Sequence, residues 1–406
     1  MLKRNISRVF IVISSIAFLQ VAATIILARH LPKAEMGLYR LILTIVDLGT
    51  LVSLRGIDQA FVRFFSSPGI YPAEYDWKSF LKSFFSVSLI IISIIAFISS
   101  FIYRFPSFVS LATVILMVML TSIFIFSSFV RARKKYGLSI FLSRMNFLIF
   151  FFLLAMLYIF KKISLINAIF YYTLAVVLAG CAVIYYAFVK IPSGEKLLPF
   201  SVTKTGIYYF GMALSIGLIL QTSYLFIGKM LSYKDLAVYA VITSIMRLFE
   251  FTQDSTYYVL APYLNTRSNV PAKKLLFTLL SLATGIALIY LFFGKIAVHI
   301  FFKGLYDEGV YLLPFFIGIG VVKTLYIFPA SIIGGRTSEI TLRNQFYLTG
   351  AAALLNICLT YAFITKWSLA GAAGASLLTW SILFVVALYG TKKHIIYNEG
   401  GYGTSM

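Results

Sequence analysis

Charged side chains inside long apolar stretches are the residues of this chain that could do chemistry. One charge at the centre of a bilayer costs about 2.5–3.5 kcal/mol on insertion scales, so the seven such charges of this chain would together cost roughly 20 kcal/mol if each were isolated. These side chains must therefore face water or one another, and ionisable groups at such depth usually mark a substrate or ion path. In chain order they are Asp47, Arg55, Asp58, Arg247, Glu250, Asp254 and Lys323.

The acidic members of this set indicate coupling to a cation. Glu250 and Asp254 lie one helical turn apart in the sequence. Two carboxylates this close raise the proton affinity of one of them or bind a cation between them. We therefore predict coupling to H⁺ or Na⁺ at this pair, with Asp47 and Asp58 as further cation-coupling candidates.

The basic members indicate an anionic substrate. A guanidinium group matches the geometry of phosphate, and an ammonium group neutralises its charge. Arg55, Arg247 and Lys323 are the candidate substrate-binding residues, and Arg40 falls on the same helical stripe as Arg55. At 100° per residue, Asp47 and Asp58 would also share this face, about 20° apart.

A simpler interpretation stays open for part of the set. Arg55 with Asp58, and Arg247 with Glu250, have the i,i+3 spacing of intrahelical ion pairs that only neutralise one another. That interpretation leaves Asp254 beside Glu250 as a second carboxylate without an assigned role.

Composition shows which elements must position these residues. The chain is 61% hydrophobic, with a mean hydropathy of +0.94 and 12% charged residues, so lipid must cover much of its surface. We predict an all-α polytopic membrane protein with about 12 transmembrane helices. The predicted spans are 6–28, 38–62, 80–102, 107–130, 141–160, 164–189, 206–228, 237–261, 274–294, 310–333, 344–365 and 369–390.

An internal repeat divides these spans into halves. Residues 31–48 align without a gap on 231–248, and Glu35 has its charge conserved as Asp235. Identical pairs at this offset are Leu31/Leu231, Tyr39/Tyr239, Ile42/Ile242, Ile45/Ile245 and Leu48/Leu248. Six helices separate the copies, and an even number predicts two six-helix bundles in the same orientation, related by a pseudo-twofold axis along the membrane normal.

Two glutamines occupy nearly equivalent points of the halves. Gln20 lies in the first span and Gln221 in the seventh. An amide at this depth lines a cavity or makes a hydrogen bond to a neighbouring helix, and the sequence leaves both interpretations open.

The repeat predicts four segments. They are an N-terminal six-helix bundle (1–190), a cytoplasmic linker (191–204), a C-terminal six-helix bundle (205–394) and a short cytoplasmic tail (395–406). In this arrangement the connections on the side of the N-terminus hold about twice as many Lys and Arg residues as the others, which predicts that both termini are cytoplasmic. The net charge of +22 is then explained by topology and anionic lipid headgroups, and no nucleic-acid partner is expected.

Catalytic chemistry has little support in the sequence. The histidines (His30, His299 and His394) are scattered, and no metal-ligand spacing, phosphate-binding loop or nucleophile elbow occurs. We therefore expect no enzyme, no cofactor and no metal site, and energy would come from an ion gradient or from the substrate.

The run ILARHLPKAEMGLYRLILTIVDLGTLVSLRGIDQAFVRFF at 26–65, with Gly37, Leu38 and Tyr39 at the start of the second span, is similar to one family. Together with the twelve-span layout and short loops, it resembles the Wzx-type polysaccharide flippases of the multidrug/oligosaccharidyl-lipid/polysaccharide (MOP) exporter superfamily. The resemblance implies a multi-pass protein of the bacterial cytoplasmic (inner) membrane. It also implies that an undecaprenyl-pyrophosphate-linked oligosaccharide moves from the inner to the outer leaflet during O-antigen-type polysaccharide biosynthesis.

The partners implied are this lipid-linked substrate, membrane lipids, H⁺ or Na⁺ and other polysaccharide assembly proteins, and the expected mechanism is alternating access between the two halves. Two alternatives remain. Cation-coupled multidrug exporters of the same superfamily often carry an acidic residue in the first helix, and residues 6–28 contain none. A polytopic polysaccharide polymerase would need a large outside loop, whereas the longest candidate, around 295–309, is short.

Overall fold

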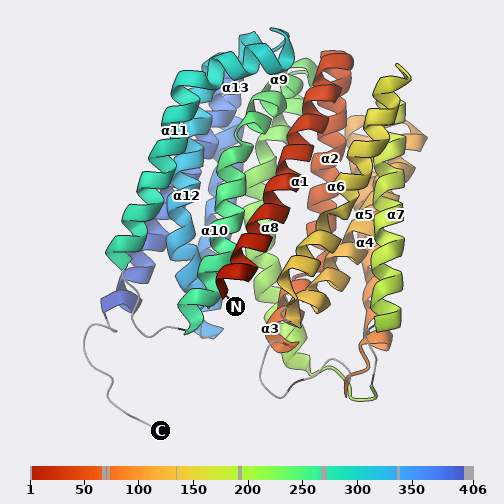
Figure 1. Ribbon diagram of the computed structural model, residues 1–406, viewed down its shortest axis with the longest axis vertical. Helices are drawn as coiled ribbons and strands as arrows, with labels where there is room; N and C mark the ends of the chain where they lie inside the picture. Colours follow the sequence, from red (N-terminus) through yellow and green to blue (C-terminus); the bar gives the residue numbers. More distant parts are fainter. Residues whose placement is uncertain are drawn as a thin grey trace. The chain divides into compact units, whose positions relative to one another are not determined.

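The computed structural model describes residues 2–65, 70, 74–133, 135–190, 194–266, 272–335 and 339–396. These residues form helices joined by short connections (Figure 1). They also contain one isolated parallel β-bridge, between Tyr75 and Lys196. The helices are α1 (Leu2–His30), α2 (Lys33–Leu54), α3 (Ile57–Phe65), α4 (Trp77–Tyr103), α5 (Ser107–Ala132), α6 (Tyr136–Ile159), α7 (Leu165–Lys190), α8 (Phe200–Met230), α9 (Tyr233–Ile245), α10 (Arg247–Thr266), α11 (Ala272–Phe302), the 3₁₀ helix η2 (Asp307–Leu312), α12 (Leu313–Gly335) and α13 (Glu339–Ile396).

Within the described residues, 10 helices are long and apolar enough to cross a membrane. The longest helix, α13, contains two predicted spans. They are separated at Ser368, whose backbone is not helical (φ 52°, ψ −129°). The predicted span 237–261 is divided between α9 and α10 at Met246. The prediction of an all-α, multi-pass membrane protein with about 12 helices is therefore confirmed.

The chain forms two compact units, Met1–Ala237 and Val238–Met406. In the N-terminal unit, α5 packs on α7, α1 packs on α6, and α2 packs on both α5 and α8. In the C-terminal unit, α12 contacts α10, α11 and α13. The predicted segment boundaries and the pseudo-twofold axis remain predictions, and residues 191–193 of the predicted linker and 397–406 of the predicted tail lie outside the described residues.

The two copies of the repeat have the same local structure at the connection where each begins. The first helix of each pair ends at His30 or Met230, and the next begins at Lys33 or Tyr233, so the connections coincide at an offset of 200 residues. The copies also touch: a Cβ atom added to Gly37 would lie 1.8 Å from the carbonyl oxygen of Tyr233. Glycine is required here because two backbones meet with no room for a side chain.

The copies differ in where the second helix breaks. We predicted one helix over 38–62, and this was wrong: α2 ends at Leu54, and both Arg55 (φ 48°) and Gly56 (φ 68°) have left-handed backbones before α3 begins. A Cβ atom at Gly56 would lie 2.2 Å from the carbonyl oxygen of Gly206 on α8. The angular relation predicted for Asp47 and Asp58 does not apply, because it assumed an unbroken helix.

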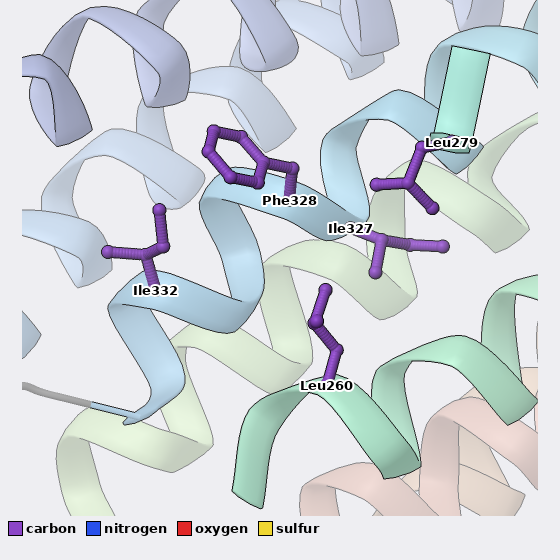
Figure 2. Packing of buried hydrophobic residues seen from close by; sticks show 5 residues of the cluster. All are labelled: Leu260, Leu279, Ile327, Phe328 and Ile332. Carbon is purple, nitrogen blue, oxygen red and sulfur yellow. The ribbon is translucent and has the colours of Figure 1, made fainter. Parts of the chain in front are cut away.

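Each unit has its own apolar core. In the N-terminal unit, Trp77 is fully buried and its ring packs on Phe126, Phe129 and Phe188. Figure 2 shows a core of the C-terminal unit, in which side chains from α10, α11 and α12 meet. Its members are Leu260, Leu279, Ile327, Phe328 and Ile332. Large apolar side chains are also exposed, for example Phe101 (79%), as expected of helices that face lipid.

Candidate functional site

Arg55 connects the break after α2 to the neighbouring helix α4. Its Nη2 atom donates to the carbonyl oxygen of Phe84 at 2.9 Å and to the hydroxyl of Ser88 at 3.3 Å. The guanidinium carbon also lies 4.4 Å from the centre of the Phe84 ring. Ser88 in turn donates to the carbonyl oxygen of Ser53 at 3.1 Å. These contacts hold the left-handed turn in place, so the structure gives Arg55 a positioning role.

Asp58 lies at the start of α3 and belongs to a second network. The amide nitrogen of Gln59 donates to Asp58 Oδ2 at 3.0 Å, and Arg131 Nη2 donates to the amide oxygen of Gln59 at 3.1 Å. Among the described residues Arg55 and Asp58 make no ion pair, so the intrahelical pair considered from the sequence is absent. The reason is the turn at 55–56, which removes the regular i,i+3 spacing.

Arg40 and Asp47 lie on the part of α2 that faces α8. The hydroxyl of Thr44 donates to the amide oxygen of Gln221 at 3.3 Å, and the amide nitrogen of Gln221 donates to Asp47 Oδ2 at 3.4 Å. The guanidinium carbon of Arg40 lies 4.4 Å from the centre of the Tyr224 ring. Asp47 is exposed, whereas the other candidate charges are half-buried.

In the C-terminal unit, the first turn of α10 holds the second predicted intrahelical pair. Arg247 Nη1 lies 2.5 Å from Glu250 Oε2, and both side chains are about one third exposed (36% and 33%). Asp254 follows one turn later on the same helix and is half-buried. Of the two pairs considered from the sequence, this one forms, and it brings a basic and an acidic candidate together.

Lys323 of α12 points toward Trp380 of α13. Its Nζ atom lies 5.4 Å from the centre of the Trp380 ring, and the Tyr326 ring meets the same tryptophan edge-on at 5.6 Å. A cation over an aromatic face is stabilised by about 0.5–2 kcal/mol, depending on desolvation. This arrangement keeps a charged amine within a candidate span (Asp307–Ile332).

Amide side chains join these charges to other helices. Gln221 links α8 to α2, which is one of the two interpretations left open by the sequence. Sequence reasoning missed two others. Gln59 links α3 to Arg131 of α5, and Gln253 donates to the Gly320 carbonyl oxygen at 3.1 Å and to the Thr324 hydroxyl at 3.2 Å. The available signal was an amide within an apolar run, which shows that a partner is needed but not which one.

The described residues contain no group of three or more His, Cys, Asp or Glu side chains placed to hold a metal ion. The candidate charges thus fall into separate small clusters in each unit: Arg40 with Asp47, Arg55 and Asp58 on either side of the break, Arg247 with Glu250 and Asp254, and Lys323 with Trp380.

Comparisons with known proteins identify solved structures that have a similar fold. No family model and no curated protein matches the chain. A multidrug resistance MATE family transporter of the MOP superfamily, in an inward-facing conformation, is 11% identical with a TM-score of 0.63, over 96% of this chain and 99% of that one. A variant of the Vibrio cholerae MATE transporter VcmN is 13% identical with a TM-score of 0.65, over 98% of this chain and 96% of that one.

A third similar structure is a MOP superfamily transporter from Pyrococcus furiosus, 12% identical with a TM-score of 0.58 over 98% of this chain and 97% of that one. It is described as having a binding pocket of reverse polarity that suggests a different function. Identities this low show the fold alone. The chain therefore has the fold of MATE family transporters of the MOP superfamily.

Proposed function

We propose that this chain is a transporter that works by alternating access, and that it moves an amphipathic substrate with an anionic headgroup. The substrate class that fits best is an undecaprenyl-pyrophosphate-linked oligosaccharide, moved from the inner to the outer leaflet of a bacterial cytoplasmic membrane during polysaccharide biosynthesis. Both termini would be cytoplasmic, and other polysaccharide assembly proteins would supply and use the substrate.

The observation that carries this proposal is a basic side chain beside an aromatic ring inside candidate membrane spans in each unit. Arg40 lies over Tyr224 in one unit, and Lys323 lies over Trp380 in the other. Basic groups held inside candidate spans favour anionic ligands, because a phosphate or acidic sugar compensates their desolvation. The Pyrococcus furiosus relative supports the idea that this fold serves pockets of more than one polarity.

The other candidate residues take different roles in this proposal. Arg55 and Arg247 remain candidate substrate-binding residues, but their contacts with α4 and with Glu250 assign them mainly to positioning. Asp254 is the leading cation-coupling residue, with Glu250, Asp47 and Asp58 as further candidates, because ionisable groups within predicted spans usually mark an ion path.

Complementation tests the proposal. A bacterium that lacks its own O-antigen flippase is given the wild-type chain, Lys323→Gln, Arg40→Gln, or the control Lys295→Gln, whose lysine is exposed on α11. Wild type and control should restore surface polysaccharide, and the two test variants should lose most of it at equal membrane abundance. Full activity of both test variants would remove the basis of the substrate assignment.

Multidrug export is a second candidate, and the fold comparisons favour it over the flippase. Similar structures include multidrug transporters, one of them the MATE multidrug transporter DinF-BH (13% identity, TM-score 0.60). In this case Glu250 and Asp254 would attract organic cations. Expression in a drug-sensitive bacterium should then raise resistance to cationic dyes, and Asp254→Asn should remove it; no resistance together with restored polysaccharide would decide for the flippase.

A further inference from the structure

A row of polar side chains runs between α2 and α8 within the N-terminal unit. We call it the α2–α8 polar seam, and it consists of Arg40, Thr44, Asp47, Gln221 and Tyr224. Arg40, Thr44 and Asp47 are spaced four and three residues apart, so they share one face of α2. Gln221 and Tyr224 are three residues apart on α8. The seam therefore occupies about two turns on α2 and about one turn on α8.

The seam ends at an exposed carboxylate within a candidate span. Asp47 is the fifteenth residue of α2, roughly 21 Å along the helix at 1.5 Å per residue, and its side chain is exposed. A carboxylate here would pay a large penalty against hydrocarbon, so its exposure points to a polar path beside the seam.

Gln221 uses both ends of its amide within the seam. Its oxygen accepts from the Thr44 hydroxyl at 3.3 Å, and its nitrogen donates to Asp47 Oδ2 at 3.4 Å. A primary amide has two N–H groups and two lone pairs, so one of each remains for a ligand while the side chain is held in position.

The chemistry of the seam matches sugar hydroxyl groups. A hydroxyl both donates and accepts, and the seam offers an amide that does both, a carboxylate that accepts and a guanidinium that donates. We propose that the α2–α8 polar seam binds the sugar hydroxyls of the lipid-linked substrate, with Gln221 as its central residue. This inference rests on the proposed flippase function. Arg40, Asp47 and Gln221 are the members that a substrate can reach, and the buried Thr44 and Tyr224 hold Gln221 and Arg40 in position.

The same geometry disfavours an organic cation at this place. A cationic drug is usually bound by an aromatic face together with a carboxylate. Here Arg40 already covers the face of Tyr224, and Gln221 donates to Asp47. A second positive charge would be repelled by Arg40, whereas a neutral or acidic sugar would not.

Binding measurements on the purified full chain in nanodiscs test the inference. The probes are undecaprenyl pyrophosphate and undecaprenyl-pyrophosphoryl N-acetylglucosamine, with ethidium as a cationic competitor. Wild type should bind the sugar-bearing lipid about tenfold tighter than the bare lipid, the ratio expected from one or two added hydrogen bonds. Gln221→Leu and Thr44→Val should lose this preference and keep their affinity for the bare lipid.

Two further variants make the result decisive. Thr222→Val is the matched control for Thr44→Val, because both threonines are buried but the hydroxyl of Thr222 donates within its own helix, to Leu218. Gln221→Asn keeps the amide group but shortens the side chain, and it should also lose the preference for the sugar-bearing lipid. This variant provides the test if Gln221→Leu fails to fold. Lipid binding without any sugar preference, or a preference kept in Gln221→Asn, would overturn the inference and leave the flippase proposal standing. Binding of ethidium but of neither lipid would overturn both.

Discussion

Arg55 illustrates how the same residue type can be used for binding or for structure. From the sequence it was a candidate for binding phosphate, but in the fold its guanidinium donates to Phe84 and Ser88 and stacks on the Phe84 ring. The Phe84 carbonyl oxygen already accepts from the Ser88 hydroxyl at 2.9 Å, so the bond from Arg55 serves the guanidinium group, which needs acceptors inside the predicted span.

Replacement of Arg55 should therefore lower stability before it affects substrate affinity. Arg55→Ala removes charge-assisted hydrogen bonds and should cost about 2–3 kcal/mol of unfolding free energy. Arg55→Lys should recover only part of this free energy, because an ammonium group cannot match the planar geometry of a guanidinium group. Thermal unfolding of the detergent-solubilised protein measures the change.

A matched control is available at the end of α4. Arg104 also follows a helix in a left-handed conformation (φ 55°), but its side chain is exposed, so Arg104→Ala makes the same change of residue type without removing a buried guanidinium. Equal melting temperatures for Arg55→Ala and Arg104→Ala would contradict the positioning role of Arg55.

At the scale of elements, the break between α2 and α3 decides where the charges of the N-terminal unit point. Its formation depends on Gly56, which combines a positive φ with a close approach to the backbone of α8. Gly37 has a similar role at the other end of α2, against Tyr233. The two glycines allow α2 and the turn before α3 to lie directly against later segments of the unit.

Gly56→Ala should destabilise the protein by roughly 3 kcal/mol, because a Cβ atom there meets backbone atoms and a left-handed conformation together. Gly285→Ala on α11 should do the opposite and stabilise by about 0.5–1 kcal/mol, since nothing lies within 4 Å of its added Cβ atom and alanine favours the helix. Unfolding of both variants in chemical denaturant measures whether their free energies of unfolding change in opposite directions. Similar effects from the two changes would show that the close approach at Gly56 is not needed.

The connection between α7 and α8 is another element with a defined structure. Residues 194–196 bond to residues 74–76 through the backbone, and Lys196 Nζ lies 2.6 Å from Glu74 Oε2. The hydrogen bond and the charge of Glu74 raise the pKa of Lys196 above its usual value. The described part of the predicted linker is thus attached to the N-terminal unit rather than being a free tether.

The sign of this pKa shift predicts a pH dependence. A lysine whose pKa is raised on folding contributes stability below its unfolded pKa of about 10.4, and loses it as pH rises through the folded value. The difference in melting temperature between wild type and Lys196→Gln should be present at about pH 8 and should shrink as the pH rises above the unfolded pKa of about 10.4. The effect will be small, because the pair is exposed. A difference that persists unchanged at high pH would mean that the charge is not responsible.

At the scale of the whole molecule, the basic residues predict which side of the membrane each connection occupies. In a background with Cys181→Ala and Cys358→Ala, single cysteines at the exposed positions Glu195 and Glu308 report on two connections that are predicted to lie on opposite sides. A membrane-impermeant maleimide should label Glu308→Cys in intact cells and Glu195→Cys only after permeabilisation. The reverse pattern would invert the topology, and with it the direction of transport that we propose.

The sequence by itself determined that lipid surrounds the protein, that the fold is all-α and where the membrane spans approximately lie. These follow from the cost of exposing backbone and charge to lipid, which each segment must meet locally. The short connections at 31–32 and 231–232 lie within the predicted gaps 29–37 and 229–236, where the repeat shares a leucine (Leu31, Leu231) and an acidic residue (Glu35, Asp235).

Only the tertiary structure decided which charges pair with each other and which stabilise a turn. Arg247 and Glu250 are three residues apart and pair as their spacing allows, whereas Arg55 bonds to Phe84, 29 residues away, and Asp47 to Gln221, 174 residues away. Helical periodicity predicts faces only while the helix continues, and the left-handed turn at 55–56 ends it. Such partners are chosen by packing between distant segments, and no local pattern in the chain specifies them.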